Sequence, residues 1–219
     1  LDLGINYKSL NGLTYLSLRT FATVISRHIV RDDFIIFSDN TTPNESTILY
    51  NGEEVTTIAN KNLGNRFIHG YSIDGFSYFS KSLKLNGSLS YVKGDENETY
   101  GPMPSISPIF GTISGEYTKD KIKISALYKF SGDKSPKDYS LGGEDGLEET
   151  PVITENSNGI IYAGTPKWSD FSIYTNYDIS EDVKIRIALT NIFDNHYRTF
   201  ASGISAPGRS FQIGLYLKL

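Results

Sequence analysis

Residues that could carry out chemistry are present in this chain, but their spacing matches no known catalytic arrangement. Cysteine is absent, and the sequence contains neither a G-x-S-x-G nucleophile elbow nor an H-E-x-x-H zinc-binding pattern. Carboxylate pairs occur only in polar, glycine-rich segments, where no apolar pocket would shift their pKa. We therefore predict no catalytic residues, no cofactor and no enzymatic activity.

The three histidines, His28, His69 and His196, all fall near long polar segments, where a metal site could form. The alternation of apolar and polar residues puts His69 on the same face as Tyr71 and Ile73, so that it points outward and does not converge with the other two. We predict histidines at a rim of the fold and no metal site.

An acidic segment, residues 134–166, offers a second possible metal site, in this case for calcium. Its carboxylates do not follow the spacing of an EF-hand loop, and we predict a solvated, mobile loop instead. The acidic residues are Asp138, Glu144, Asp145, Glu148, Glu149 and Glu155.

Basic residues form a third group, and they recur at positions that the alternation places on the inward face of the predicted strands. Few acids, such as Asp74 and Glu116, share that face. The pattern suits an anionic ligand, for instance a metal chelate that carries carboxylates or catecholates. Alternatively, these side chains line a wet lumen or contact another domain. The candidate ligand-binding residues are Arg19, Arg27, Lys84, Lys123 and Arg186, and the same pattern includes Lys8, Lys129, Lys184 and Lys218.

The single tryptophan, Trp168, begins a predicted strand. With Tyr174 and Tyr177 nearby, it is predicted to anchor the strand at a membrane interface, where amphipathic aromatic rings are enriched. A platform on which a sugar ring stacks is the alternative.

The elements that would position these residues are β-strands, because apolar and polar residues alternate with a period of two along almost the whole chain. At the C-terminus, Phe211, Ile213, Leu215 and Leu217 share one parity, and the other parity is polar apart from Tyr216. Tyrosine (15), phenylalanine (12) and glycine (20) are abundant, which also favours many short strands.

The connections between the predicted strands alternate between short and long. Short turns fall near residues 10–12, 80–82, 119–121 and 179–182, and long polar stretches near residues 34–64, 95–106, 134–166 and 196–207. Tight turns at one edge and long loops at the other are typical of an antiparallel transmembrane β-barrel. The sequence therefore predicts an all-β fold of this kind.

The predicted number of strands is about nine, whereas single-chain bacterial barrels normally have an even number. A sheet left open in lipid would also leave backbone groups without hydrogen bonds. We therefore interpret residues 1–219 as the C-terminal part of a larger barrel of about 22 strands.

Charge and hydropathy exclude two other classes of protein. A formal net charge of -4 argues against a nucleic-acid partner, because binding phosphates requires clustered lysine and arginine in excess. No apolar run of about 18 residues occurs, so no transmembrane helix is predicted. β-Strands with only one apolar face can cross a membrane without such an apolar run.

The segment from residue 191 to the C-terminus, NIFDNHYRTFASGISAPGRSFQIGLYLKL, carries a distinctive series of residues: Asn191, Phe193, Asp194, Tyr197, Arg198, Pro207, Gly208 and Arg209. Asparagine and aspartate can bond to nearby backbone where a strand ends, and Pro-Gly allows the turn back into the sheet. In order and spacing this segment closely resembles the last hairpin of TonB-dependent outer-membrane receptors. Further segments of that family are similar to residues 101–117 and, more loosely, to residues 62–75. We include residues 1–61 in the resemblance because the same alternation of apolar and polar residues continues through them.

The resemblance implies a receptor in the outer membrane of a Gram-negative bacterium, whose long loops capture a scarce solute such as a ferric siderophore, haem, cobalamin or an oligosaccharide. The expected partners are a small-molecule or metal-chelate ligand, outer-membrane lipid and the TonB complex. TonB would act through an N-terminal region, with its plug domain, that residues 1–219 do not include. Members of the family usually end in an aromatic residue, whereas this sequence ends in Leu219.

Two alternatives remain open. A soluble all-β adhesion or carbohydrate-binding module would pack its apolar faces sheet against sheet. A passive porin would conduct ions without an energy-supplying partner. An outer-membrane enzyme is a more distant alternative, because no nucleophile lies in a catalytic setting.

Overall fold

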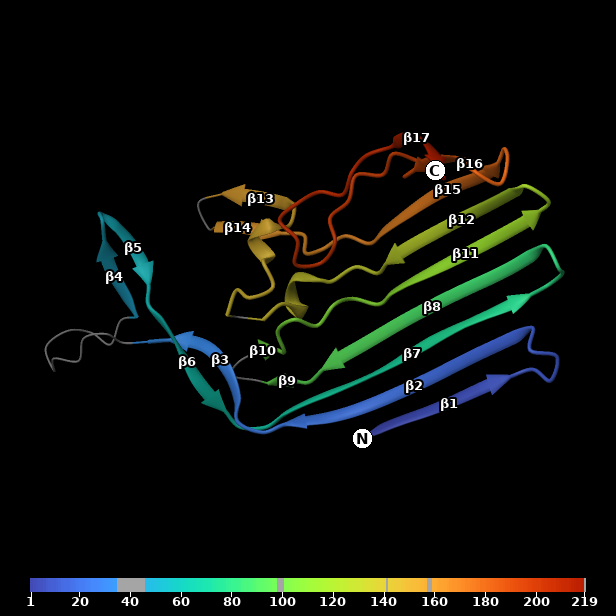
Figure 1. The fold of residues 1–219 in the computed structure, drawn as a ribbon. Coiled ribbons are helices and arrows are strands. Elements are labelled where there is room, and N and C mark those ends of the chain that lie inside the picture. The colour runs from blue at the N-terminus through green and yellow to red at the C-terminus, as the bar shows by residue number, and fades with distance from the viewer. Residues whose placement is uncertain (35–45, 98–100, 141, 157–158, 219) are drawn as a thin grey trace, which may run out of the picture.

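The computed structural model describes residues 1–34, 46–97, 101–140, 142–156 and 159–218, which form strands, two short 3₁₀ turns and connecting loops (Figure 1). No helix in these ranges is long and apolar enough to cross a membrane. The strands are β1 (Asp2–Lys8), β2 (Thr14–Ile25), β3 (His28–Asp33), β4 (Thr47–Tyr50), β5 (Glu53–Thr56), β6 (Ile58–Leu63), β7 (Arg66–Tyr78), β8 (Leu83–Gly94), β9 (Glu96–Asn97), β10 (Gly101–Pro102), β11 (Phe110–Lys119), β12 (Ile122–Ser131), β13 (Val152–Asn156), β14 (Gly159–Tyr162), β15 (Trp168–Asp178), β16 (Val183–Thr190) and β17 (Ser210–Leu217), and the 3₁₀ turns are η1 (Pro136–Asp138) and η2 (Leu147–Glu149).

Nine of the strands form one antiparallel sheet in the order β1-β2-β7-β8-β11-β12-β15-β16-β17. The all-β fold and the predicted nine strands are therefore confirmed. Figure 1 shows the long strands lying side by side, with the sheet curving from β1 to β17. Within the described residues the sheet is open, because β1 pairs only with β2 and β17 only with β16.

One face of this sheet is apolar along its whole width. Residues that pair directly across antiparallel strands point to the same face, and Leu18 pairs with Ile73, which pairs in turn with Leu89. These apolar side chains stay exposed, with Ile113 at 54% and Ile213 at 66% of their possible surface. In the described part of the chain no second sheet covers this face, contrary to what a soluble sandwich predicts.

The two edges of the sheet differ as the sequence predicts. Four short turns join β1 to β2, β7 to β8, β11 to β12 and β15 to β16, while all the other connections leave from the opposite edge (Figure 1). We refer to these edges as the short-turn edge and the loop edge.

The long connections are more ordered than predicted, because several of their polar stretches fold into small hairpins. The pairs β3-β6, β4-β5, β9-β10 and β13-β14 each form a separate two-stranded sheet at the loop edge. In β4-β5 the turn residues Asn51 and Gly52 both have positive φ, 51° and 90°, as a tight hairpin turn of this kind requires. Asparagine and glycine adopt that backbone at little cost.

Candidate functional site

The basic residues predicted to bind a ligand lie on the polar face of the sheet, but they do not converge on one point. Lys84, Lys123 and Arg186 belong to β8, β12 and β16 and lie close to the short-turn edge, while Arg19 lies midway along β2. Arg27 lies beyond the end of β2 in a bend with a φ of 53°, so strand alternation does not fix its direction. The predicted polar face is therefore correct for four of the five candidate residues. These four side chains lie at different distances from the short-turn edge.

Three of these cations already have partners within the chain. The Lys84 ammonium lies over the rings of Phe76 and Tyr78, at 4.8 and 5.4 Å from their centroids. Lys123 forms an ion pair with Glu116 across β11 and β12. The Arg186 guanidinium lies 5.9 Å from the centroid of the Tyr174 ring.

The three histidines lie on different elements. His28 begins β3, His69 lies on the apolar face of β7 as predicted, and His196 follows β16, where its Nε2 atom is 3.0 Å from the Ser205 hydroxyl oxygen. Among the described residues, no three histidine, aspartate or glutamate side chains are grouped so that they could hold a metal ion.

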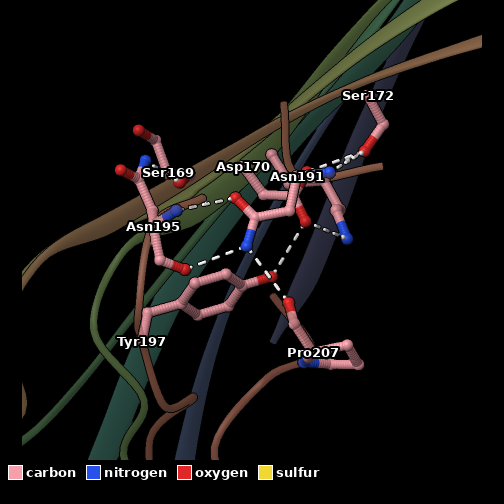
Figure 2. A network of polar contacts seen from close by, with 8 residues as sticks. Ser169, Asp170, Ser172, Asn191, Asn195, Tyr197 and Pro207 are labelled. Atoms are coloured by element: carbon pink, nitrogen blue, oxygen red, sulfur yellow. Dashed lines mark hydrogen bonds and ion pairs between the residues drawn. The ribbon is translucent and has the colours of Figure 1, made fainter. Parts of the chain in front are cut away.

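Three of the family-motif residues, in contrast, lie together at the loop edge: Figure 2 shows Tyr197 and Pro207 beside Asn191. Asn191 is 2% exposed, and its amide nitrogen donates to the carbonyl oxygens of Asn195 and Pro207, at 2.9 and 3.1 Å. Its side-chain oxygen accepts a hydrogen bond from the Asn195 backbone N–H, and its own backbone N–H donates to the Ser172 hydroxyl. Asn191 thus joins β15, through its backbone N–H, to both ends of the loop between β16 and β17, through its side-chain amide.

Asp194 fixes the return of this loop into the last strand. Its Oδ1 atom accepts a hydrogen bond from the backbone N–H of Arg209 at 2.7 Å, and the Arg209 guanidinium lies 3.7 Å from Oδ2. A Cβ atom on Gly208 would come within 3.0 Å of Oδ1, so the close approach favours glycine. Asp194 thus bonds to the backbone at the far end of the loop, where the last strand begins.

Tyr197 and Trp168 form the second part of the motif site. Their rings are parallel, and the Tyr197 hydroxyl donates to Oδ2 of Asp170 at 3.0 Å. Asp170 also accepts from the Ser172 hydroxyl and pairs with Lys129. Burial, together with the Asp170 carboxylate, raises the pKa of Tyr197 to about 12, so the phenol stays protonated as a donor.

The position of Trp168 corrects the predicted membrane anchor. Trp168 pairs with Ser131, and Tyr174 pairs with Ala188, so both rings lie on the polar face of the sheet. Of the three aromatic residues in that prediction only Tyr177 lies on the apolar face, where it pairs with Ile122. The prediction is wrong because Trp168 lies three residues before Phe171, and strand alternation therefore puts the two rings on opposite faces.

The remaining motif residues link the loop to its neighbours. The Arg198 guanidinium donates to the backbone carbonyl of Glu149 at 2.9 Å and lies 3.8 Å from its carboxylate. Phe193 packs against Phe171, with ring centroids 6.0 Å apart, and is 68% exposed. Phe171 lies on the apolar face, opposite Tyr128, so Phe193 contacts the apolar side of the sheet.

A buried ion pair, which the sequence did not predict, ties three loops together nearby. The Lys134 ammonium donates to Oδ2 of Asp145 and to the carbonyl oxygen of Ile106, at 2.8 and 2.7 Å. Oδ1 of Asp145 accepts from the backbone N–H of Ser105, and the Phe200 ring lies 4.1 Å from the ammonium. The Lys134 and Asp145 side chains are only 5% and 2% exposed. The prediction of a merely solvated acidic loop is therefore wrong for Asp145.

Two cavities lie among these loops. One of about 250 Å³ is bounded by Glu149, Lys167, His196 and Arg198. The other, of about 330 Å³, has the buried Arg66 in its wall, and the Arg66 guanidinium is held by Asp95 at 2.7 Å. Concave spaces bounded by loops on a rigid sheet are where a small ligand would be held.

No known protein-family model matches the chain, and no curated protein is significantly similar to it. Its fold does match solved structures. The match to the copper transporter OprC has a TM-score of 0.69 at 15% identity, over 99% of this chain and 31% of OprC. The match to the siderophore receptor PirA from Acinetobacter baumannii has a TM-score of 0.67 at 17% identity, over 99% of this chain and 31% of PirA. For a variant of the ferric enterobactin receptor PfeA from Pseudomonas aeruginosa the values are 0.66 and 17%, over 99% and 30% of the two chains.

These solved proteins are TonB-dependent outer-membrane receptors, and the chain has the fold of part of their barrel. The chain spans about 30% of the length of these solved structures.

Proposed function

We propose that this chain, which has the fold of part of a TonB-dependent receptor barrel, is the C-terminal part of such a receptor in the outer membrane of a Gram-negative bacterium. The receptor binds a scarce solute at the cell surface and imports it with energy that the TonB complex supplies. It performs no bond chemistry. The N-terminal plug domain and the segment that engages TonB belong to a part of the receptor outside residues 1–219.

The observation that carries this proposal is the single apolar face that runs across all nine strands of the sheet. At about 25 cal/mol per Å² of apolar surface, so broad an exposed face would be costly in water, whereas acyl chains solvate it without cost. The loop edge then faces the outside of the cell and the short-turn edge faces the periplasm, as in other outer-membrane barrels.

The ligand class that the chain supports best is a small molecule or a metal chelate. The titles of the solved neighbours name copper, iron, siderophores and ferric enterobactin as what those proteins bind or transport. Arg19 on the polar face, together with Arg27 in the bend beyond β2, suits a chelate with anionic groups. Lys84, Lys123 and Arg186 lie near the short-turn edge and would meet such a ligand late in its passage.

Uptake by the full-length receptor tests this function. Cells that express it in the outer membrane would be given ⁵⁵Fe(III) chelated by citrate, by a catecholate or by a hydroxamate, with and without an intact TonB complex. We expect accumulation of at least one chelate that disappears without TonB. Ion conductance that does not depend on TonB would support a porin instead, and recovery of the receptor in the aqueous fraction would support the soluble alternative.

A further inference from the structure

One ion pair at the loop edge differs from the others in its almost complete removal from water. The Lys134 and Asp145 side chains are 5% and 2% exposed, with Nζ and Oδ2 2.8 Å apart. In every other ion pair of the described residues, at least one of the two side chains is 35% exposed or more. A buried pair is costly to keep charged, because the attraction between the ions has to repay the hydration that both have lost.

The surroundings hold the amine of this pair against the carboxyl group. The Lys134 ammonium donates to Oδ2 of Asp145 and to the carbonyl oxygen of Ile106, so two of its three protons have fixed acceptors. The rings of Phe200 and Tyr139 lie 4.1 and 5.0 Å from Nζ. Such an enclosed contact leaves little room for water, and exclusion of water from a reacting pair suppresses hydrolysis.

The second oxygen of the carboxyl group faces a backbone donor. Oδ1 of Asp145 accepts a hydrogen bond from the N–H of Ser105 at 2.7 Å. Ser105 has a φ of 62°, a left-handed conformation that residues with a side chain seldom adopt. A fixed donor at the oxygen of a carbonyl group under attack stabilises the negative charge that develops there. The Ser105 N–H therefore lies where it would assist a reaction at the carboxyl carbon of Asp145.

We infer that Lys134 and Asp145 condense to an amide, an isopeptide bond within the loop between β12 and β15. One ammonium proton passes along the hydrogen bond to Oδ2, and the neutral Nζ forms a bond to the carboxyl carbon Cγ. Oδ2 then leaves as water with a second proton from Nζ, so that a C–N bond replaces a C–O bond. No oxidant, reductant or further reactant is consumed.

The amide keeps the contacts that the ion pair makes and loses its cost. Its oxygen, Oδ1, still accepts from the Ser105 N–H, and its single N–H can still donate to the Ile106 carbonyl. Neither charge remains in the interior, which removes the penalty for burying them. Proximity also favours the reaction, because two groups held in contact react far faster than the same groups free in solution.

Such a bond would give the loop edge a covalent cross-link. Residues 1–219 contain no cysteine, whereas proteins outside the cytoplasm commonly stabilise their loops with disulfides. A loop fixed in this way keeps its shape when a protease cuts it once. The position of this edge outside the cell rests on the proposed function, but the bond itself depends only on the contacts around Lys134.

The test is the mass of the tryptic peptides of the folded, full-length receptor. An amide on Lys134 blocks cleavage there and joins the peptide of residues 130–137 to that of residues 138–167. The joined product is lighter than the sum of the two peptides by one water molecule. We expect it in the wild type and not in Lys134→Arg, which keeps a cation beside Asp145 but lacks the amine that forms the bond.

The ion pair of Lys61 and Asp32 is a control within the same digest. Its Nζ and Oδ2 atoms are also 2.8 Å apart, but its side chains are 45% and 29% exposed. Trypsin should therefore cleave after Lys61, and the peptides on either side should have the masses that their sequences give. A loss of water at this exposed pair as well would show that contact alone suffices, and it would contradict the role assigned to burial.

Separate peptides at their full masses from the folded wild type, with Lys134 cleaved, would overturn the inference and leave a plain ion pair. The joined product from wild-type chain isolated as inclusion bodies and kept in urea would overturn it too, because the bond would then form without the fold. A receptor that carries the joined peptides but shows no TonB-dependent uptake would contradict the proposed function alone, so the two failures are distinguishable.

Discussion

The indole ring of Trp168 lies parallel to the phenol ring of Tyr197, with centroids 4.3 Å apart and planes inclined by 14°. The contact joins the first residue of β15 to the loop between β16 and β17. It places the loop on the polar side of the sheet, where the Tyr197 hydroxyl reaches Asp170.

Removing the Tyr197 ring should uncover one face of the indole, whereas removing only its hydroxyl should not. We expect Tyr197→Ala to shift the fluorescence emission of Trp168 to longer wavelength, because water reaches the indole. Tyr197→Phe should leave the emission nearly unchanged. The measurement is the difference spectrum between each variant and the wild-type receptor. Equal spectra for the alanine and phenylalanine variants would show that the rings do not stack in solution.

The raised pKa of Tyr197 predicts a loss of stability in alkali. An unfolded tyrosine ionises near pH 10, whereas the pKa in the folded chain is about 12. Between these values the unfolded state binds fewer protons, so the protonated phenol stabilises the fold below pH 10 and this contribution declines as the pH rises toward 12. Tyrosinate absorbance at 295 nm in the wild type, minus that in Tyr197→Phe, should titrate near pH 12. A difference that titrates near pH 10 would contradict the buried contact.

Asn191 should be intolerant of both small and isosteric replacements. Asn191→Ala leaves the Asn195 N–H and two carbonyls without partners and places alanine at a φ of 47°. In Asn191→Asp, a carboxylate oxygen replaces the amide nitrogen and faces the carbonyl oxygens of Asn195 and Pro207, to which it cannot donate a hydrogen bond. Each change should cost about 2–4 kcal/mol in the unfolding of this region, measured by denaturant-induced loss of the heat-modifiable band. Ser180→Ala, at the short-turn edge, serves as the control and should cost under about 0.5 kcal/mol.

The buried pair of Lys134 and Asp145 should show strong coupling in a double-mutant cycle. Lys134→Met leaves an uncompensated carboxylate at 2% exposure, and we expect a cost of about 3–5 kcal/mol in local stability. Lys134→Met/Asp145→Leu should recover most of it, because neither charge remains buried. Limited proteolysis between residues 133 and 150 measures the local opening. Additive effects of the two single variants would contradict the coupling.

The apolar face predicts a strong asymmetry between neighbouring positions of one strand. Ile113→Arg places a charge among acyl chains near the middle of β11 and should destabilise the inserted barrel by about 2–4 kcal/mol. Ser114→Arg, one residue later, points to the polar face near Glu116 and should be tolerated. Unfolding of the receptor from vesicles by guanidinium gives both values. Similar costs at the two positions would mean that the face does not contact lipid.

The architecture could be predicted from the sequence because its signals are local and periodic. Alternation around Ile213 and Leu215 specifies which face of β17 is apolar, and the same parity holds in the paired strand through Ile185 and Ile187. The alternation of short and long connections specifies the edge of the sheet at which the long loops lie. The hairpin β4-β5 lies within the long polar stretch predicted at residues 34–64, and its turn residues Asn51 and Gly52 are a strong local signal for it.

The site could be predicted only in part, because its contacts join residues far apart in the chain. The motif indicated Asn191 and Asp194, but nothing local indicates that Lys134 meets Asp145 or that Arg198 meets Glu149. Parity placed Lys84 on the correct face, and it could not show that the Lys84 ammonium would lie over the Phe76 ring. Such pairings depend on how loops fold back over one another, for which a sequence carries no periodic signal.

The cross-links between loops also bear on how such a surface can change its specificity. Lys134 and Arg198 connect the segments around Ile106, Asp145 and Glu149, so these loops form one mechanical block. In the receptor that we propose, a ligand that draws one of these loops inward would have to carry the others with it. Adaptation to a new solute would for the same reason require concerted substitutions in several loops, or would proceed through the hairpins that stand outside the block.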